Sequence, residues 1–357
     1  MNMNIIVKDD ENITTITEYL DFNLISYTRN SLWNPNIDQF GRNELSDELV
    51  HNDSTLLILD HTTFNNLCSW PTSLTQLIKF CSNNNKIWVW SNIDGLLVST
   101  THQSILLSLD KQVISSCITV FVDGKLSDHH PLVKLKNIQF KIFPYNFFLQ
   151  RHRLRSAVVD KSNCSKDFML TTVKKSDRPH REILWNQLTA IPGLVDCGHV
   201  NYGSGQTRIG QQAFQHGWSD GYPSMDLYRN SWLELVPETM YRGGYFVTEK
   251  TTKPIATKTP FLTVSTRYYL EYLKQLGFQT FGNIIDEGYD QQSMVEDRIQ
   301  LMLLQLQDIV KNGAESFYNE CASVLEHNQN RLFEISGRNQ YDMDLFIAEN
   351  LELVGIA

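Results

Sequence analysis

The feature that most constrains the fold is an alternation of short apolar runs with segments of helical spacing. Each run is four to six residues long and ends at a turn-forming residue, and the stretches between them place Leu or Ile three and four residues apart. Strands are predicted at 4–7, 24–27, 56–60, 86–90, 118–122 and 138–143, and helices at 72–80 and 103–109. Strands separated by helices pair in parallel, which predicts an α/β fold.

The alternation continues in residues 230–290, around which the second half is organised. Residues 231–236 form an apolar run that Pro237 ends, which predicts a buried strand. A helix is predicted to begin after Thr248, where Pro254 limits or kinks it, and 261–264 is a further strand. Leucines at helical spacing then precede Gly277, a residue typical of helix C-termini. Upstream, strands are predicted at 168–173 and 194–201, and a helix at 182–188.

Thr248, Glu249 and Lys250 carry the clearest chemical signal. A helix start presents free N–H groups and the positive end of the helix dipole, which suits a diphosphate. Lys250 adds a positive charge there, and Glu249 can accept hydrogen bonds from a ribose diol. This arrangement predicts nucleotide binding, while the simpler alternative is a capped surface helix whose charges lie in solvent.

A second basic segment precedes another predicted helix. Lys175, Arg178 and Arg181 follow the 168–173 strand, and Pro179 fits the first turn of the helix, with Ser176 or Asp177 as its cap. A strand, a basic loop and a helix start form a second place for a phosphate. The alternative is a solvated basic turn.

An ordered set of residues in the second half resembles a known group of enzymes. The set comprises Leu235 to Thr239, Phe246 to Ile255, Pro260, Phe261, Leu276 to Phe278, Thr280, Phe281, Asp286, Glu287, Tyr289 and Asp290. It resembles the donor-domain signature of a glycosyltransferase group that is frequent in phage and large-virus genomes. Its Thr-Glu-Lys core is similar to the nucleotide-sugar motif of the fucosyltransferases. The likeness begins near Asp167, and the first 160 residues show no such resemblance.

The resemblance implies a GT-B fold, in which two Rossmann-like domains face each other across a cleft. It implies a nucleotide-sugar donor as substrate, no cofactor and no metal. The donor-binding residues that it implies are Thr248, Glu249, Lys250, Glu238 and Thr251, together with Arg178 and, secondarily, Lys175 and Arg181. In the related fucosyltransferases a basic residue in the loop that contains Arg178 to Arg181 here contacts the diphosphate.

A chain of 357 residues predicts two domains. The expected division is an acceptor domain at 1–150, a linker at 151–166, a donor domain at 167–335 and a tail at 336–357 that packs back on the N-terminal domain. In the first domain Asp94, Asp60 and His61 lie at or just after strand ends, where parallel sheets bind ligands. Any of them could act as the base that takes the acceptor proton, with Asp94 favoured. The alternative for each is a turn or cap residue.

The distribution of charge and cysteine along the sequence narrows the kind of ligand and the cellular compartment that are expected. Between Lys125 and Arg181, thirteen Lys or Arg stand against four acids, a net +9 that leaves −18 on the rest of the chain. This predicts either a basic face that meets phosphate or charges scattered over the surface. The six cysteines form no C-x-x-C pair, no signal peptide is evident and no apolar run approaches the length of a bilayer span. A cytoplasmic protein, in the host cytoplasm if viral, is therefore expected.

Three functions remain open from the sequence. The first is a glycosyltransferase whose acceptor is a hydroxymethylated base in viral DNA, or else a surface glycan or lipopolysaccharide. The basic interval favours DNA, whereas the overall charge of −9 disfavours tight nonspecific DNA binding. The second is another sugar-nucleotide enzyme such as an epimerase, which the missing G-x-G-x-x-G disfavours. The third is a noncatalytic nucleotide- or glycan-binding protein with the same fold.

Overall fold

The structure, a computed structural model, describes residues 4–7, 28–29, 55–60, 64, 67–68, 71–83, 85–91, 100–113, 117–122, 124–128, 130–142, 159–173, 178–203 and 225–353. The chain divides into two compact units. The N-terminal unit comprises residues 1–144 and 340–357, and the C-terminal unit comprises 145–339.

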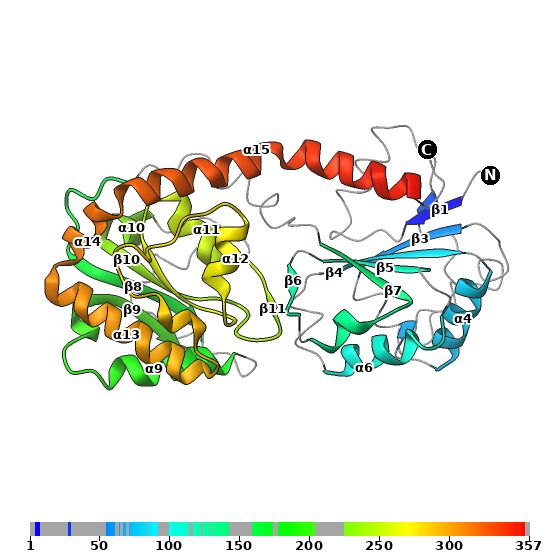
Figure 1. Cartoon of the computed structure of the whole chain (residues 1–357), viewed down its shortest axis with the longest axis horizontal. Coiled ribbons are helices and arrows are strands. Elements are labelled where there is room, and N and C mark those ends of the chain that lie inside the picture. Colours follow the sequence, from blue (N-terminus) through cyan, green and yellow to red (C-terminus); the bar gives the residue numbers. More distant parts are fainter. Residues whose placement is uncertain are drawn as a thin grey trace. The chain divides into compact units, whose positions relative to one another are not determined.

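The N-terminal unit contains a six-stranded parallel sheet (Figure 1). Its strands are β1 (Asn4–Val7), β2 (Thr28–Arg29), β3 (Thr55–Asp60), β4 (Lys86–Ser91), β5 (Ile118–Val122) and β7 (Ile138–Ile142), in the order β2-β1-β3-β4-β5-β7. Leu56 to Leu59 and Ile118 to Val122 are buried, as expected for strands covered on both faces. The helices α4 (Pro71–Ser82) and α6 (Thr100–Leu109) connect strands of this sheet. The order reverses between β1 and β3, as in doubly wound folds.

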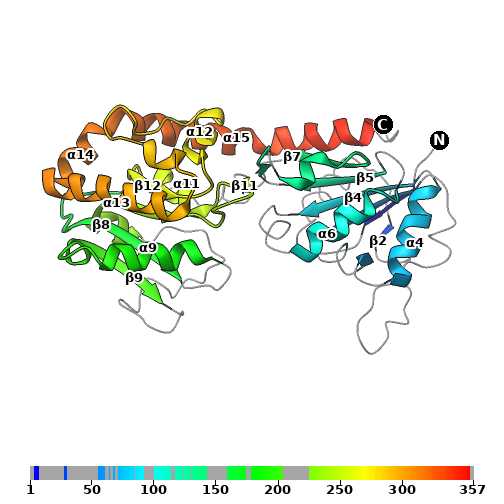
Figure 2. The same cartoon turned by 60° about the horizontal axis from the view of Figure 1, so that its bottom comes forward.

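The C-terminal unit contains a four-stranded parallel sheet. Its strands are β8 (Lys166–Val173), β9 (Gly198–Gly203), β10 (Ser231–Pro237) and β12 (Phe261–Val264), in the order β12-β10-β8-β9. The helices α9 (Pro179–Thr189) and α13 (Val295–Asn312) pack together on one side of the sheet, and α11 (Glu249–Ala256) lies on the other (Figures 1 and 2). The two units are thus both Rossmann-like, which confirms the predicted α/β fold class.

The remaining elements are short, except for the last helix, α15. They are β6 (Lys125–Leu126), η2 (Pro131–Lys134), η3 (Val195–Cys197), α10 (Met225–Asn230), β11 (Gly244–Tyr245), α12 (Tyr269–Gln275), η5 (Gly288–Gln291), α14 (Ala314–Glu320) and α15 (Ala322–Leu353). The end of α15, from Gln340, groups with the N-terminal unit, where Asn350 accepts a hydrogen bond from Lys141. The apolar face of α13 contributes Ile299, Met302, Leu303 and Leu306 to the core of the C-terminal unit.

Most predicted elements lie within two or three residues of the observed ones. Gly277 has a φ of +88°, and its N–H donates to Lys274 while that of Phe278 donates to Leu273, which is the Schellman pattern that ends α12. Pro179 occupies the first turn of α9, as predicted. The residue before it, Arg178, is therefore the N-cap, and the predicted cap at Ser176 or Asp177 is wrong. The predicted strand at 24–27 lies outside the described residues.

The predicted strand at 194–201 is partly wrong. Its first residues form the turn η3, in which the N–H of Cys197 donates to the carbonyl of Leu194, and β9 begins only at Gly198. Gly198 pairs with Phe168, whose ring would lie 2.6 Å from an added Cβ. The strand therefore starts where a residue without a side chain permits close packing on β8.

Part of the segment predicted as a linker packs onto the C-terminal unit. The side chain of Lys161 is buried, and its Nζ donates to the carbonyls of Tyr228 (2.6 Å) and Ser231. The same atom lies 5.4 Å from the centre of the Tyr318 ring. Burial lowers the pKa of Lys161 to about 8. Residues 159–165 thus continue into β8 as part of the C-terminal unit, and the boundary at 151–158 lies outside the described residues.

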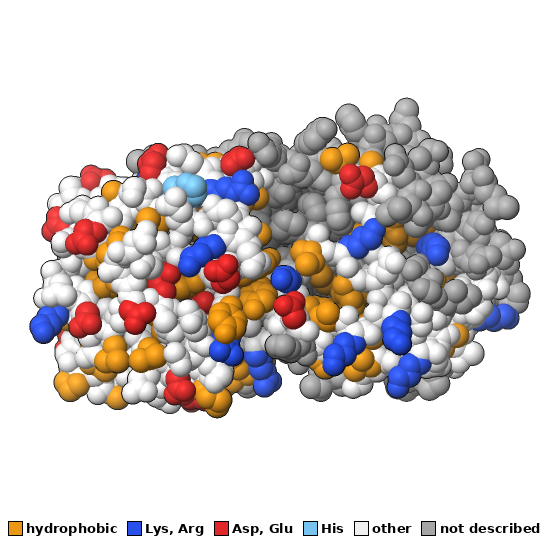
Figure 3. All heavy atoms as spheres, in the orientation of Figure 1, with side chains coloured by type: hydrophobic (Ala, Val, Ile, Leu, Met, Phe, Trp, Pro, Cys, Tyr) orange, Lys and Arg blue, Asp and Glu red, His pale blue; other side chains and the backbone are white. Residues whose placement is uncertain are grey.

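Among the described residues, three cations of the basic interval are withdrawn from the surface of the C-terminal unit. Lys161, Arg178 and Arg181 are buried, and Lys166 donates to the carbonyl of Asp196. Figure 3 shows charges of both signs interspersed on the visible face of the C-terminal unit, whereas the described charges of the N-terminal unit seen there are mostly basic. The six cysteines are free thiols. Within the described residues, no helix combines the length and the apolar character needed to cross a bilayer.

Asp290 holds the start of α12 from a distance. The preceding residue, Tyr268, has a left-handed backbone (φ 66°) and makes no side-chain cap. The buried carboxylate of Asp290 accepts instead from the N–H groups of Tyr269 (3.2 Å) and Leu270 (3.0 Å). We expect Asp290→Ala to destabilise the C-terminal unit by about 1–2 kcal/mol, the usual effect of losing a helix cap.

Urea unfolding of wild type and variant measures this loss. Asp290→Asn is the matched control, because it keeps one acceptor oxygen and should lose less than Asp290→Ala. Equal stability of wild type and Asp290→Ala would show that Asp290 does not cap α12.

Candidate functional site

The candidate site lies at the carboxyl edge of the C-terminal sheet, where the order of strands reverses. The first strand of this sheet, β8, lies between β9 and β10, so the switch point is the gap between β8 and β10. After β8 the chain reaches Arg178 and the start of α9, and after β10 it reaches Glu238. In open parallel sheets this edge is where ligands bind.

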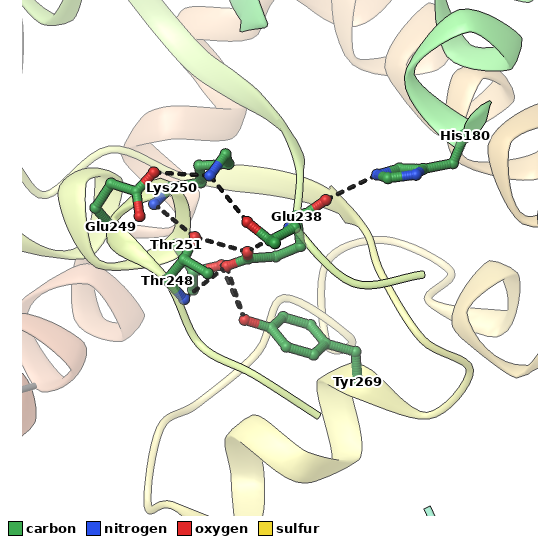
Figure 4. A network of polar contacts seen from close by, with 8 residues as sticks. His180, Glu238, Thr248, Glu249, Lys250, Thr251 and Tyr269 are labelled. Atoms are coloured by element: carbon green, nitrogen blue, oxygen red, sulfur yellow. Dashed lines mark hydrogen bonds and ion pairs between the residues drawn. The ribbon is translucent and has the colours of Figure 1, made fainter. Parts of the chain in front are cut away.

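The start of α11 is built as the sequence predicted. Thr248 is the N-cap, with an extended backbone, and its hydroxyl accepts from the N–H of Lys250 (3.2 Å). The same hydroxyl donates to Glu238 Oε2 (2.7 Å), which leaves its lone pairs directed at the helix. Pro254 lies inside α11, and the helix continues to Ala256 before it ends. Figure 4 shows Thr248, Thr251 and Tyr269 gathered around Glu238.

Glu238 is the centre of a buried network. Its Oε1 accepts from the N–H of Thr248 (3.0 Å), the hydroxyl of Thr251 (2.7 Å) and the hydroxyl of Tyr269 (3.2 Å). Its Oε2 accepts from the N–H of Thr239 (2.9 Å) and from the Thr248 hydroxyl. Burial and the adjacent carboxylate raise the pKa of Tyr269, which therefore stays a donor. We call Glu238, Thr239, Thr248, Thr251 and Tyr269 the Glu238 network.

Glu249 and Lys250 form a pair above this network. Lys250 Nζ lies 2.7 Å from Glu249 Oε1 and donates to the Thr239 hydroxyl at 3.1 Å. The Glu249 and Lys250 side chains are only 27% and 17% exposed, so neither extends into bulk solvent. Burial opposes ionisation of Glu249, but Lys250 and Lys253 outweigh it and hold the pKa of Glu249 below its ordinary value. The pair is thus a partly buried, charged surface at the start of a helix.

His180 connects the starts of α9 and α11. Its Nε2–H donates to the carbonyl of Glu238 at 2.7 Å, and its ring stacks on Tyr241 with centroids 4.8 Å apart. Burial lowers the pKa of His180 to about 3, and the charges of Arg181, Arg178 and Lys250 act in the same direction. The ring is therefore neutral near neutral pH.

The predicted donor-binding residues differ in how far their side chains reach the surface. Glu249 and Lys250 are partly exposed, and Arg178 and Arg181 are buried beside His180. Glu238, Thr248 and Thr251 are buried and bonded to one another, so they shape the site from beneath. Lys175 lies outside the described residues, as do Asp94 and His61. Asp60 is the last residue of β3, at the carboxyl edge next to β1.

Two members of the site were not singled out from the sequence. His180 lies within the Arg-Pro-His-Arg run, and Tyr269 is part of a helical pattern. Each is explained by its neighbours in the sequence, which give no sign of its contact with Glu238. Among the described residues, no three His, Cys, Asp or Glu side chains are grouped as metal ligands.

No protein-family model and no curated protein matches this sequence. Several solved structures do. One is a T4 phage beta-glucosyltransferase, with a TM-score of 0.43 and 13% identity over 96% of this chain and 98% of that chain. Another, of the DNA-modifying enzyme beta-glucosyltransferase with and without uridine diphosphoglucose, has a TM-score of 0.43 and 14% identity over 96% and 98%. An alpha1,3-fucosyltransferase with GDP-fucose has a TM-score of 0.35 and 12% identity over 88% and 81%. At this level of similarity, the function is inferred from the residues of the site itself.

Proposed function

We propose that this protein is a glycosyltransferase that binds a nucleotide sugar at the switch-point edge of its C-terminal unit. The observation that carries the proposal is the partly buried Glu249–Lys250 pair at the capped start of α11, which follows β10 at the same edge of the sheet as the start of α9 with Arg178 and Arg181. A diphosphate is the ligand that such a helix start and the Lys250 ammonium suit. The buried Arg178 and Arg181 add positive charge at the start of α9. Glu249 then offers carboxylate oxygens to the hydroxyl groups of the ribose.

The transfer step needs a base for the acceptor hydroxyl. We place it in the N-terminal unit, where Asp60 ends β3 at the switch point between β1 and β3. Asp94, which the sequence favours, and His61 remain the other candidates. The proposed reaction requires no metal and no cofactor.

The proposed acceptor is a modified base in DNA, and the alternative is a surface glycan. The basic interval at 125–181 supports DNA, because the DNA backbone requires cations. The N-terminal unit as a whole carries ten Lys or Arg against nineteen Asp or Glu, which disfavours tight nonspecific DNA binding.

A panel of nucleotide sugars tests the proposal. We expect UDP- or GDP-linked sugars to raise the melting temperature of the full chain and to be consumed when an acceptor is added. Mass spectrometry then compares hydroxymethylated DNA with glycan acceptors for the added sugar. Binding without turnover on either acceptor would favour the noncatalytic alternative, and no binding to any member of the panel would contradict the proposal.

A further inference from the structure

The carboxylate of Glu238 faces the protein and not the proposed ligand. Its side chain is fully buried at 0% exposure, and five donors of its own chain point at its two oxygens. A carboxylate has about four lone-pair directions, so these contacts fill it. Glu238 therefore has no capacity left for a ribose or a phosphate.

The donors of the Glu238 network come from three elements. Thr248 and Thr251 belong to the start of α11, Tyr269 begins α12, and Thr239 follows β10. The main chain of Glu238 is fixed as well, since its N–H donates to the carbonyl of Val264 (2.9 Å) and its carbonyl accepts from His180. One residue thus joins the ends of β10 and β12 to the starts of α9, α11 and α12.

This position links Glu238 to the charged pair through two short routes. On one route, Glu238 Oε2 accepts from the Thr248 hydroxyl, which in turn accepts from the N–H of Lys250. On the other, Glu238 Oε2 accepts from the N–H of Thr239, whose hydroxyl accepts from Lys250 Nζ. Both the main chain and the ammonium group of Lys250 are therefore set by contacts to residues that Glu238 holds.

We infer that Glu238, together with His180, is a positioning residue for the nucleotide-sugar site. It fixes the start of α11 and the Lys250 ammonium in the geometry that the donor binds, without touching the donor. The inference rests on the proposed function, because it concerns the same site. Binding groups held by a packed second layer of hydrogen bonds lose affinity when that layer is removed.

Glu238→Gln is the direct test. Each carboxylate oxygen faces one main-chain N–H, of Thr239 or of Thr248, which can only donate, so the amide group loses at least one contact and the neighbouring hydroxyl groups must reverse theirs. UDP-glucose and GDP-fucose are the probes, and calorimetry is run on the full chain below the melting temperature of each variant. We expect Glu238→Gln to weaken the binding of whichever probe wild type binds by about tenfold or more. Tyr269→Phe removes only the longest of the five contacts and should weaken binding by about threefold or less.

A double-mutant cycle separates positioning from a general loss of stability. If Glu238 acts through Lys250, the two losses overlap. The affinity of the double variant Glu238→Gln with Lys250→Ala is then within about threefold of the affinity of whichever single variant binds less tightly. Two results would overturn the inference and leave the proposed function standing. One is that the affinity losses of the two single variants multiply in the double variant. The other is that a folded Glu238→Gln binds the probe as tightly as wild type, while Lys250→Ala binds it more weakly. Unchanged binding in Lys250→Ala itself would instead overturn the proposed function.

Discussion

Lys250→Ala is expected to lower the affinity for the nucleotide sugar by about 10- to 100-fold while leaving the protein folded. A hydrogen bond to a charged group contributes about 1.5–3 kcal/mol, and about 1.4 kcal/mol corresponds to a tenfold change in binding. The Lys250 and Glu249 side chains are only 17% and 27% exposed, so Lys250→Ala also leaves a partly buried carboxylate without this partner and is expected to lower the stability of the folded protein. Calorimetry with wild type and variant measures the affinity, and thermal unfolding measures the fold.

The matched control is Lys274→Ala, which removes the same charge from the exposed side of α12. It should bind the donor as wild type does. Glu249→Ala is expected to weaken binding as Lys250→Ala does, whereas the loss should be smaller for Glu249→Gln, which keeps one acceptor oxygen. Equal losses in Lys250→Ala and Lys274→Ala would mean that net charge, and not the pair at α11, determines donor affinity.

Glu234→Gln is expected to remove a pH dependence of stability. Glu234 lies in β10, where its side chain is buried and its Oε2 accepts from the Tyr228 hydroxyl at 2.6 Å. Burial raises the pKa of Glu234 from its ordinary value to about 7, although Tyr228, Lys253 and Lys161 oppose the shift. Between the unfolded pKa near 4.5 and the folded pKa near 7, the folded chain holds a proton that the unfolded chain has lost. Stability therefore falls as pH rises through this window and levels off above it.

The full effect of this shift is on the order of 3 kcal/mol between pH 4.5 and pH 8. Burial also raises the pKa of Asp290 to about 7, which gives wild type a second contribution of the same sign. The difference between the stability–pH profiles of wild type and Glu234→Gln isolates the contribution of Glu234. Urea unfolding at several pH values should give a flatter profile for Glu234→Gln, and the exposed substitution Glu296→Gln serves as control. Parallel profiles for wild type and Glu234→Gln would show that Glu234 ionises normally in the folded chain.

The predictions made from sequence succeeded where the signal is local. Gly277, Pro179 and Thr248 each mark a helix end through their own backbone preferences, and the apolar runs mark the strands because each strand is buried as a unit. The roles of Glu238 and Asp290 could not be predicted in this way. Glu238 contacts residues 10, 13 and 31 positions away, and Asp290 caps a helix that begins 21 positions earlier.

Lys161 illustrates the same limit for burial. A Lys in a polar, basic stretch is typical of a surface linker, yet here carbonyl groups from α10 and β10 satisfy its ammonium inside the unit. Likewise, resemblance placed Glu238 and Thr251 among the donor-binding residues because of their position in the motif. Their burial and mutual hydrogen bonds indicate that a residue of such a motif can act on the structure beneath the ligand.

The most direct measurement is hydrogen–deuterium exchange of the full chain with and without a saturating nucleotide sugar from the panel. We predict that binding slows exchange in peptides covering residues 246–256, where the N–H groups of α11 and the Glu249–Lys250 pair lie, and around 178–182. Saturated binding that leaves both segments unchanged and protects residues elsewhere would contradict this prediction.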